Sequence, residues 1–589
     1  MGLLQRAVET YDANQDRVGR YYEGHEPLAP IGHIITGADI EVTLNQDGKF
    51  VSARKVDKAE PKTIIPVSEE SGGRTCAPVA HPLCDQLKYI LSADTDTYAL
   101  YVEGLKKWAV SDYQHPFLNS ILTYVEGGTL QSDLATCGIV DAYDEKNDGK
   151  KMVCWRVIND GGQEPAVWKN TNLQETYIAY YLSQLENREK AVCMVSGDVT
   201  AVAGQHPKGI IPVNGNAKLI SSNDSNGFTY RGRFDTDRQA ASVGYIASQK
   251  AHNALRWLAS EQGVREFSGN RIYICWNPEG KAIPRPMRSI RQAADPIRKP
   301  TDYKEDLKRI LWDVKSLNQL KENDRAVFVS FDAATTGRLA QTYYNDISVG
   351  QFLQRLQEWD SDCCWYNGKY GIQSPSLFQI VEGAYGTQRG NFLEVDDKIQ
   401  RQHLQRLLDI KINGGVFPAD IVKALVQRAS SPQSFEDGVW RKLMFTACAV
   451  LQKYRSDTKK GGNEMSWDLD KKDRSFQFGR LLAAMERAES DYYYKTNENR
   501  QTNAIKNMSQ FRRNPWSVFE RINRQLNQAY LGRIEQWQKA RYERVKDEIC
   551  KILREFPEGD LNKPLEDTYL MGYEIQRNAF FEKSDKGEE

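Results

Sequence analysis

Apolar residues recur at helical spacing at the start of the chain and again over its last third. Leu3, Leu4, Ala7, Val8 and Tyr11 follow a period near 3.6, which predicts an amphipathic helix. The same spacing returns at Phe478, Leu481, Leu482 and Met485, and later at Phe519, Ile522, Leu526, Ile534, Val545, Ile549 and Leu553. We therefore expect a C-terminal α-helical bundle.

Strand patterns occupy the first part of the chain and alternate with helices. Segment 40–56 contains two strand-like stretches separated by Asp47 and Gly48, which predicts a β-hairpin. Short apolar runs predict strands near 63–67, 151–158, 271–276 and 325–331. A loop through Gly72 and Gly73 and a helix beginning near Cys84 are expected next to the first of these strands. Helical spacing predicts helices over 98–110, 175–185, 242–263 (capped by Ser242) and 347–359.

The chain has 589 residues, too many for a single hydrophobic core. The expected fold class is α+β, with a mixed β-rich N-terminal domain followed by a C-terminal α-helical bundle. The pattern divides into an α+β domain over 1–265, an α/β middle region with a basic linker over 266–395, and the helical bundle over 396–589.

One stretch, residues 191–234, differs from the core-forming segments around it. Glycines interrupt it at 197, 204, 209, 215 and 227, and only brief strands are expected, near Val192 and at 209–213 and 217–220. It is basic through Lys208, Lys218, Arg231 and Arg233. It also concentrates short hydrogen-bonding side chains, namely Asn214, Asn216, Ser221, Ser222, Asn223, Asp224, Ser225 and Asn226.

This composition suits a polar ligand that is bound by its edge. Asparagine presents a donor and an acceptor together, and glycine lets the backbone approach a partner closely. Arginine and lysine neutralise phosphate. The alternative interpretation is a structural loop whose Asn and Ser side chains satisfy their own turns.

Composition and charge exclude several classes of protein. The formal net charge is zero, so any nucleic-acid surface must be local. No apolar run approaches the roughly 18–20 residues of a membrane span, and the acidic residues near the N-terminus are unlike a secretory signal. The ten cysteines include no CxxC pair, so we expect reduced thiols, a cytoplasmic location, and no metal or cofactor.

Two regions are locally basic. Arg285, Arg288 and Arg291 lie in a proline-punctuated linker that also contains Lys281, Arg298 and Lys299. Residues 500–546 contain eleven Lys or Arg and three Glu, most densely at Arg512, Arg513, Arg521 and Arg524. Such a one-sided excess is compatible with phosphate binding, and equally with a solvated helix face.

Recognised catalytic motifs are absent from the sequence. It has no GxxxxGK[ST], GxSxG or HExxH motif, and no GxGxxG after a strand. The seven histidines are scattered, and Cys193 with His206 would supply only two metal ligands. These absences favour a binding protein over an enzyme.

Several segments, in order, resemble one known family. They are LLQRAVETYD near the start, RTCAPVAHPLCDQLKYIL, the polar stretch from CMVSGD through HPKGI and LISSND to FTYRGR, the helix ASQKAHNALRWL, ICWN, FGRLLAAMERAE, NPWSVF and FPEGDLNKPLEDTYLMGYEIQRNAFF. Together they span nearly the whole chain. The sequence resembles the large subunit of the type I-C CRISPR surveillance complex, Cascade.

The resemblance implies a non-catalytic subunit near the 5′ handle of a guide RNA (crRNA). Such a subunit recognises the short flanking motif of the target (the PAM) in double-stranded DNA, helps to unwind the duplex and stabilises the R-loop. The implied partners are the Cascade backbone and handle-binding subunits, a small subunit and a separate helicase-nuclease, with no membrane partner. The alternative is a scaffold that binds the guide RNA handle and neighbouring subunits without reading the PAM. A nuclease is the third, least favoured interpretation.

The resemblance also implies roles for residues of the polar stretch. Asn pairs bidentately with adenine and Lys with guanine in the major groove, and Asn can also read the minor groove. The candidates for PAM or base contacts are Asn214, Asn216, Lys218, Ser221, Ser222, Asn223, Asn226 and Tyr230. The candidates for DNA backbone contacts are Lys208, Arg231, Arg233, Arg74, Arg285, Arg288, Arg291, Arg512, Arg513, Arg521 and Arg524.

In the same family the C-terminal part is often also made separately, as a small subunit. Here the residues KKGGNE, 459–464, can be encoded with a bacterial ribosome-binding sequence shortly before Met465. A product covering 465–589 would have about 125 residues, a sensible size for a small helical domain. The alternative is that KKGG is only a flexible linker.

Overall fold

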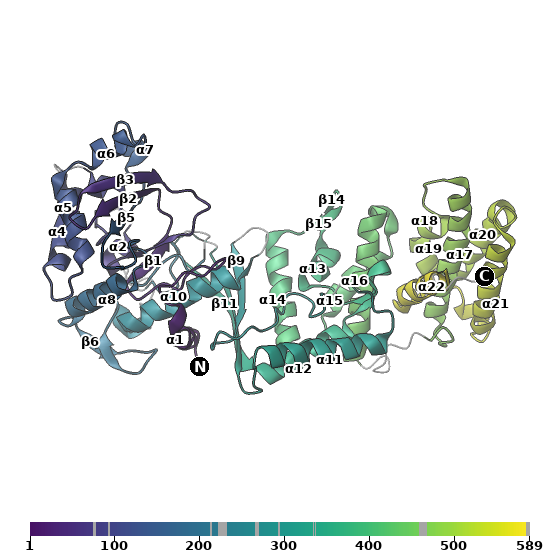
Figure 1. The fold of residues 1–589 in the computed structure, drawn as a ribbon. Helices are drawn as coiled ribbons and strands as arrows, with labels where there is room; N and C mark the ends of the chain where they lie inside the picture. Colours follow the sequence, from purple (N-terminus) through teal and green to yellow (C-terminus); the bar gives the residue numbers. More distant parts are fainter. Residues whose placement is uncertain are drawn as a thin grey trace. The chain divides into compact units, whose positions relative to one another are not determined.

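The computed structural model describes residues 1–74, 78–91, 95–211, 215–221, 233–265, 270–292, 295–333, 335, 337–458 and 468–584. They form two compact units that are interleaved along the chain (Figure 1). The first unit contains Met1–Ile283 and Asp324–Ile347, and the second contains Pro284–Asn323 and Ser348–Glu589. The expected α+β class is confirmed, because strands concentrate in the N-terminal part and helices in the C-terminal part. Residues 266–395, which were expected to form a middle region, are divided between the two units.

The N-terminal half of the first unit is built around a three-stranded sheet. The predicted hairpin is confirmed as β2 (Ile40–Asn45) and β3 (Phe50–Lys55), and β5 (Val153–Ile158) adds to β2 in parallel. Its turn requires Gly48, because φ is +77° and a Cβ there would lie 2.5 Å from the Ser120 carbonyl oxygen. The helices α4 (Asp96–Ala109), α5 (Pro116–Gly127) and α8 (Thr171–Leu185) contribute to one hydrophobic core with this sheet.

A second sheet completes the first unit and has the strand order β11-β10-β9-β8. Its strands are β8 (Val264–Arg265), β9 (Arg271–Trp276), β10 (Arg325–Asp332) and β11 (Ala340–Ser348). Helices α1 (Leu3–Ala13) and α10 (Tyr245–Glu261) share a hydrophobic core with it. The Trp276 indole donates a hydrogen bond to Thr10 Oγ1 at 2.9 Å, which ties β9 to α1. The hydrophobic core on this sheet therefore unites the first residues of the chain with residues more than 300 positions later.

Short elements connect these two layers of the first unit. They are η1 (Gln15–Arg17), β1 (His33–Thr36), β4 (Thr63–Pro66), α2 (Glu69–Gly73), α3 (Leu87–Ile90), α6 (Leu130–Thr136), α7 (Glu145–Asp148), β6 (Lys190–Val192), β7 (Val199–Ala201) and α9 (Asp237–Ala240). Two expectations are wrong here. Gly72 and Gly73 lie in α2, where Ser68 accepts a capping bond from Ser71 N–H. Helix α10 is capped by Gly244, because the Ser242 hydroxyl donates to the Val192 carbonyl instead.

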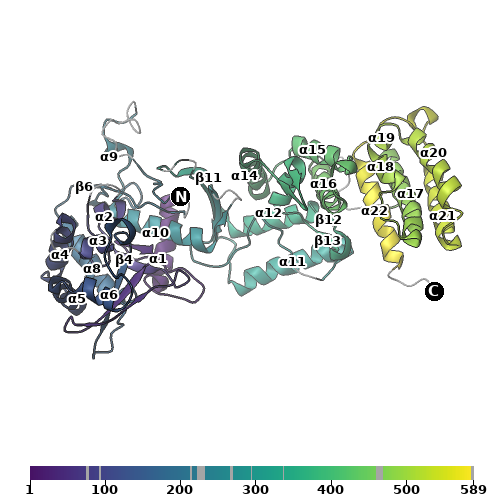
Figure 2. The ribbon, with the colours of Figure 1, turned by 90° about the horizontal axis from the view of Figure 1, so that it is seen from above.

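The second unit is mostly helical (Figure 2). Its first part comprises α11 (Pro300–Leu317), α12 (Val349–Asp362), α13 (Leu377–Tyr385), α14 (Asp397–Asn413), α15 (Ala419–Ala429) and α16 (Asp437–Asp457), with short strands β12 (Trp365–Tyr366), β13 (Ile372–Gln373), β14 (Thr387–Arg389) and β15 (Phe392–Glu394). Its last part comprises α17 (Arg474–Thr496), α18 (Asn503–Lys506), α19 (Met508–Arg513), α20 (Pro515–Gln525), η4 (Leu526–Tyr530), α21 (Gln536–Leu553) and α22 (Thr568–Ser584). The helical character predicted for residues after 395 is confirmed.

A buried ion pair organises the first part of the second unit. Lys411 on α14 and Asp360 on α12 are both completely buried, and their charged atoms lie 3.3 Å apart. Asp360 also accepts hydrogen bonds from the Ser289 hydroxyl and the Ile290 backbone N–H, at 2.9 and 2.7 Å. One carboxylate therefore fixes part of the basic linker against two helices, and its several donors compensate its burial.

Two glycines permit the close crossing of α17 and α22. A Cβ at Gly479 would overlap the Tyr569 carbonyl, and a Cβ at Gly572 would overlap the Phe476 carbonyl. The obstacles are backbone atoms, so they cannot rotate away as a flexible side chain can. The separation of these two helices therefore depends on the absence of side chains at both positions.

We predict that Gly479→Ala lowers the stability of the C-terminal helices by about 1–3 kcal/mol, the usual effect of overpacking. The added methyl group must push α17 away from α22. Differential scanning calorimetry measures the change as a lower thermal midpoint. The matched control is Gly438→Ala on α16, where a Cβ meets nothing within 4 Å. A midpoint unchanged in Gly479→Ala would contradict the close-crossing interpretation.

Candidate functional site

The structure describes only part of the polar stretch 191–234, namely 191–211, 215–221 and 233–234. Among the predicted contact residues, Lys208, Asn216, Lys218, Ser221 and Arg233 lie in these parts. The others of this stretch, Asn214, Ser222, Asn223, Asn226, Tyr230 and Arg231, lie outside the described residues, as does Met465.

The described part of the stretch is anchored to the second sheet's core by its backbone. Lys218 N–H donates to the Gly337 carbonyl at 3.2 Å, and Leu339 N–H donates to the Lys218 carbonyl at 3.0 Å. The strand expected at 217–220 is wrong, because Lys218 forms only isolated bridges, to Lys208 and Arg338. Gly209 has a φ of +71°, so the chain turns there and no ladder develops. Predicted strands near Val192 and at Arg271–Trp276 are confirmed.

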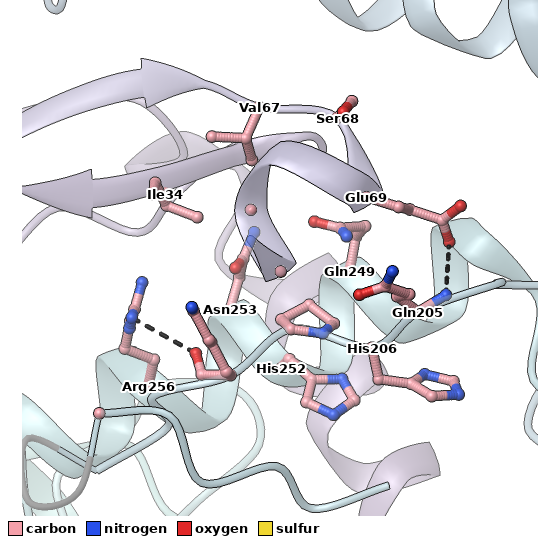
Figure 3. Close-up of a pocket in the computed structure, with 15 residues that line it drawn as sticks. Ile34, Val67, Ser68, Glu69, Gln205, His206, Gln249, His252, Asn253 and Arg256 are labelled. Atoms are coloured by element: carbon pink, nitrogen blue, oxygen red, sulfur yellow. Dashed lines mark hydrogen bonds between the residues drawn. The ribbon is translucent and has the colours of Figure 1, made fainter. Parts of the chain in front are cut away.

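A cavity of about 90 Å³ lies between this stretch, the end of α2 and one face of α10 (Figure 3). Ile34, Val67 and Pro207 supply apolar side chains to its wall, and glycines and polar residues form the rest. Four polar residues of α10 line it, namely Gln249, His252, Asn253 and Arg256. A second cavity of about 110 Å³ shares Gln205 and His206 with the first and is bounded by Lys218, Ser221 and Arg238.

Two buried histidines lie beside the first cavity. Their rings stack with centroids 5.8 Å apart, and Ser248 lies within hydrogen-bond distance of His206 Nδ1, at 2.8 Å. Burial lowers the pKa of His206 to about 3 and that of His252 to about 4, so both rings are neutral at pH 7. His252 Nδ1 lies 2.7 Å from the Ser248 carbonyl, which can only accept, so Nδ1 carries the proton. His252 Nε2 is then an acceptor with no partner among the described residues.

Three cations border the cavities and form no ion pair among the described residues, although Glu26 lies near enough to Arg256 to raise its pKa against the effect of burial. Lys208 Nζ donates to the Arg74 carbonyl at 3.0 Å, and Lys218 Nζ donates to Gln205 Oε1 at 3.3 Å. Arg256 Nε donates to the Gly209 carbonyl at 2.9 Å. Burial lowers the pKa of all three, and Lys218 and Arg74 lower that of Lys208 further. Glu69 itself lines the first cavity, but its carboxylate is paired with Arg188 and accepts the Gly204 N–H.

Arg74, a candidate for DNA backbone contact, is held inside the first unit. Its guanidinium forms two bonds to Asp85, at 2.9 and 2.5 Å, and one to the Val79 carbonyl at 2.7 Å. It also lies over the Tyr89 ring, 4.6 Å from the centroid. Arg74 thereby fixes the end of α2, and its own backbone carbonyl accepts the hydrogen bond from Lys208 Nζ.

The basic linker lies in the second unit and presents its arginines unequally. Arg285 and Arg288 are exposed, whereas Arg291 is buried and paired with Asp306 at 2.9 Å. The Arg288 carbonyl accepts a bond from Lys411, which fixes the backbone beneath the exposed guanidinium.

The C-terminal arginines also differ in their availability. Arg513 and Arg524 are exposed, and Arg521 is exposed while it bonds to Asn507 and Gln510. Arg512 is half-buried and pairs with Asp567 at 3.1 Å.

Sequence reasoning missed the wall contributed by α10 and by Gln205. Gln249, His252, Asn253 and Arg256 follow an i, i+3, i+4, i+7 spacing within a helix that was predicted from its apolar face. That second, polar stripe was the available signal, and all but Arg256 are buried by the fold.

Neither a metal-ligand cluster nor a membrane-spanning helix occurs among the described residues. Among them, no group of three or more His, Cys, Asp or Glu is arranged to hold a metal ion. Within the same residues, no helix is both long and apolar enough to span a bilayer.

Comparison with known proteins identifies one family. The model for "CRISPR-associated protein (Cas_Csd1)" matches residues 8–581, which is nearly the whole chain. None of the curated proteins matches it.

We predict that acid destabilises the first unit through His252. Its folded-state pKa of about 4 lies below the unfolded value of about 6.5, so the unfolded chain binds more protons between these values. The free energy of unfolding therefore falls as the pH drops from 7 towards 4. Replacing His252 with Gln should make the fall between pH 7 and 4.5 smaller by about 2 kcal/mol. Urea denaturation at each pH measures this, and parallel curves for wild type and variant would contradict it.

Proposed function

The chain belongs to the Csd1 family of CRISPR-associated proteins, and we propose that it is the non-catalytic large subunit of a type I-C Cascade complex. In this role it recognises the PAM in duplex DNA, helps to unwind the target and stabilises the R-loop. It also helps to recruit the helicase-nuclease that cuts the DNA. Base pairing with the guide RNA then reads the rest of the target.

The observation that carries the proposal is the group of acid-poor cations beside the polar stretch. Lys208, Lys218 and Arg256 converge on two cavities, and their hydrogen-bond acceptors are neutral oxygens. A positive surface of this kind, next to a segment rich in asparagine, suits a polyanion that also presents the edges of bases. Membership of a CRISPR-associated family supports the proposal that this polyanion is target DNA.

The proposed division of labour follows the chemistry of each side chain. Asn223 and Asn226 contact base edges, with Asn214, Asn216, Ser221, Ser222 and Tyr230 as further candidates. Lys208, Arg231 and Arg233 hold phosphates of the flanking duplex. The exposed Arg285, Arg288, Arg513, Arg521 and Arg524 serve the DNA backbone farther along the target. The guide RNA and the Cascade backbone, handle-binding and small subunits complete the assembly, which we place in the cytoplasm.

We predict that Asn223→Ala combined with Asn226→Ala removes the preference for a flanking motif. The assembled complex would be tested for binding to duplex targets with a randomised flank, followed by sequencing of the bound fraction. Each lost base contact should reduce discrimination by about 1–3 kcal/mol, while the complex still assembles.

A matched control replaces two exposed asparagines of the first unit, Asn172 and Asn187, with Ala. We expect this control to retain the wild-type preference. If the Asn223 and Asn226 variant keeps its preference and loses only assembly, the chain acts as a scaffold. Cleavage of DNA by the isolated chain with a divalent metal would instead indicate a nuclease.

We further propose that residues 465–589 are also made separately as the small subunit. Helix α17 begins at Arg474 and packs against both α21 and α22. The proposed product would therefore contain a bundle of its own, together with the exposed Arg513, Arg521 and Arg524. A positive face of this kind suits a subunit that lies along displaced or hybridised DNA.

We predict that Met465→Ala eliminates a small band that co-purifies with the complex. Silent recoding of the Lys459–Gly462 codons, which leaves the protein unchanged, should reduce the same band by weakening ribosome binding. Gel electrophoresis with mass spectrometry of the band measures both. A band that persists in both variants would show that the internal start is not used.

A further inference from the structure

Three buried or half-buried arginines of the first unit are each neutralised by a carboxylate. Arg6 pairs with Asp346 at 2.8 Å, Arg271 with Asp332 at 3.0 Å, and Arg74 with Asp85. This is the expected arrangement, because an uncompensated charge in a poorly hydrated site is costly.

Lys208 and Lys218 depart from this arrangement in the same place. Their backbones form a bridge with each other, and each amino group reaches only a neutral oxygen. Both side chains are half-buried, and neither has a carboxylate within ion-pair distance among the described residues. Two positive charges therefore lie close together and are partly removed from water. No described carboxylate offsets the free-energy cost of this desolvation.

The second cavity opens onto this unbalanced charge. Lys218, Ser221 and Arg238 line it together with the Gln205 and His206 wall. Arg238 has an exposed partner, Glu189, which solvent screens. The second cavity has a volume of about 110 Å³, which exceeds the roughly 30 Å³ that one water occupies in the liquid. The cavity therefore has room for a tetrahedral oxyanion.

The end of α2 approaches this place closely because residue 73 is glycine. A Cβ at Gly73 would overlap Gln205 Oε1 and lie 3.8 Å from Lys218 Nζ. Gln205 Oε1 is the acceptor that holds the Lys218 amino group. The absence of a side chain at Gly73 therefore allows Gln205 to position Lys218 at the cavity wall.

We infer that this cavity is a phosphate subsite, in which Lys218, Ser221 and Arg238 bind one phosphate group and Lys208 strengthens the positive field. The inference rests on the proposed function for the source of that phosphate, a backbone phosphate of the target DNA. It changes the role of Lys218, from a reader of base edges to an anchor of the backbone. A bound phosphate supplies the negative charge that the described residues do not provide there.

Replacement of a lysine changes the thermal midpoint in opposite directions, depending on whether the lysine binds a ligand or stabilises the fold. Lys218→Met removes an uncompensated charge, so the thermal midpoint of the free full-length chain in chloride should stay constant or rise. If Lys218 were structural, the midpoint would fall. Lys49→Met, which replaces an exposed lysine of the same unit, is the matched control.

Binding of duplex DNA by the assembled complex tests the ligand itself. Loss of one phosphate contact should reduce the magnitude of the slope of log affinity against log salt by about 1. We expect this change and a roughly tenfold weaker affinity for Lys218→Met, recovery for Lys218→Arg, and no change for Lys49→Met. An unchanged salt slope in a folded Lys218→Met complex would overturn the subsite.

Inorganic phosphate, compared with chloride at equal ionic strength, distinguishes the source of the ligand. A higher thermal midpoint in phosphate for wild type but not for Lys218→Met supports a site that also accepts the free ion. A changed DNA salt slope without this effect supports a site for backbone phosphate alone. Failure of the proposed function is distinguishable, because PAM preference would then be absent in wild type while the salt slope still responds to Lys218→Met.

Discussion

Compensation of buried charge is the constraint on which this structure depends. In the first unit Asp85 holds Arg74 at the end of α2, and in the second Asp360 holds Lys411 together with two groups of the basic linker. Each carboxylate joins segments that are far apart in the sequence or that belong to different secondary-structure elements. Such pairs contribute little net stability, but removal of one partner is costly, and so they fix which segments must remain in contact.

The same constraint locates the candidate site. Cations that are paired with a carboxylate have a structural role, as do Arg74, which pairs with Asp85, and Arg291, which pairs with Asp306. Where only neutral oxygens are supplied, at Lys208 and Lys218, the protein has retained positive charge at the wall of a cavity. The neutral imidazoles of His206 and His252 close the wall without adding charge, because burial depresses their pKa.

The C-terminal helices obey a different constraint, which is steric. Gly479 and Gly572 bring α17 and α22 together so closely that backbone atoms replace side chains at the crossing. The bundle is also joined to the preceding helix, because Arg441 of α16 reaches Glu486 at 3.0 Å and Tyr573 at 3.1 Å. In a separately made 465–589 chain, Glu486 would keep the Tyr573 hydroxyl as a donor but would lose the Arg441 guanidinium.

Local sequence determined the elements whose own residues carry the signal. The 40–55 hairpin, the strand Arg271–Trp276 and the helices α1, α8 and α10 follow from periodicity and turn chemistry, which act over a few residues. The cap of α10 and the conformation near Lys218 could not be predicted, because Val192 and Gly337 compete for the same hydrogen-bonding groups from afar. The candidate site followed the same division: the sequence by itself determined that Lys208 and Lys218 are basic and near many glycines. Only the tertiary structure decided that Arg74 pairs with the Asp85 carboxylate, whereas Lys208 and Lys218 have no carboxylate partner among the described residues. Charge compensation depends on contacts between distant parts of the chain.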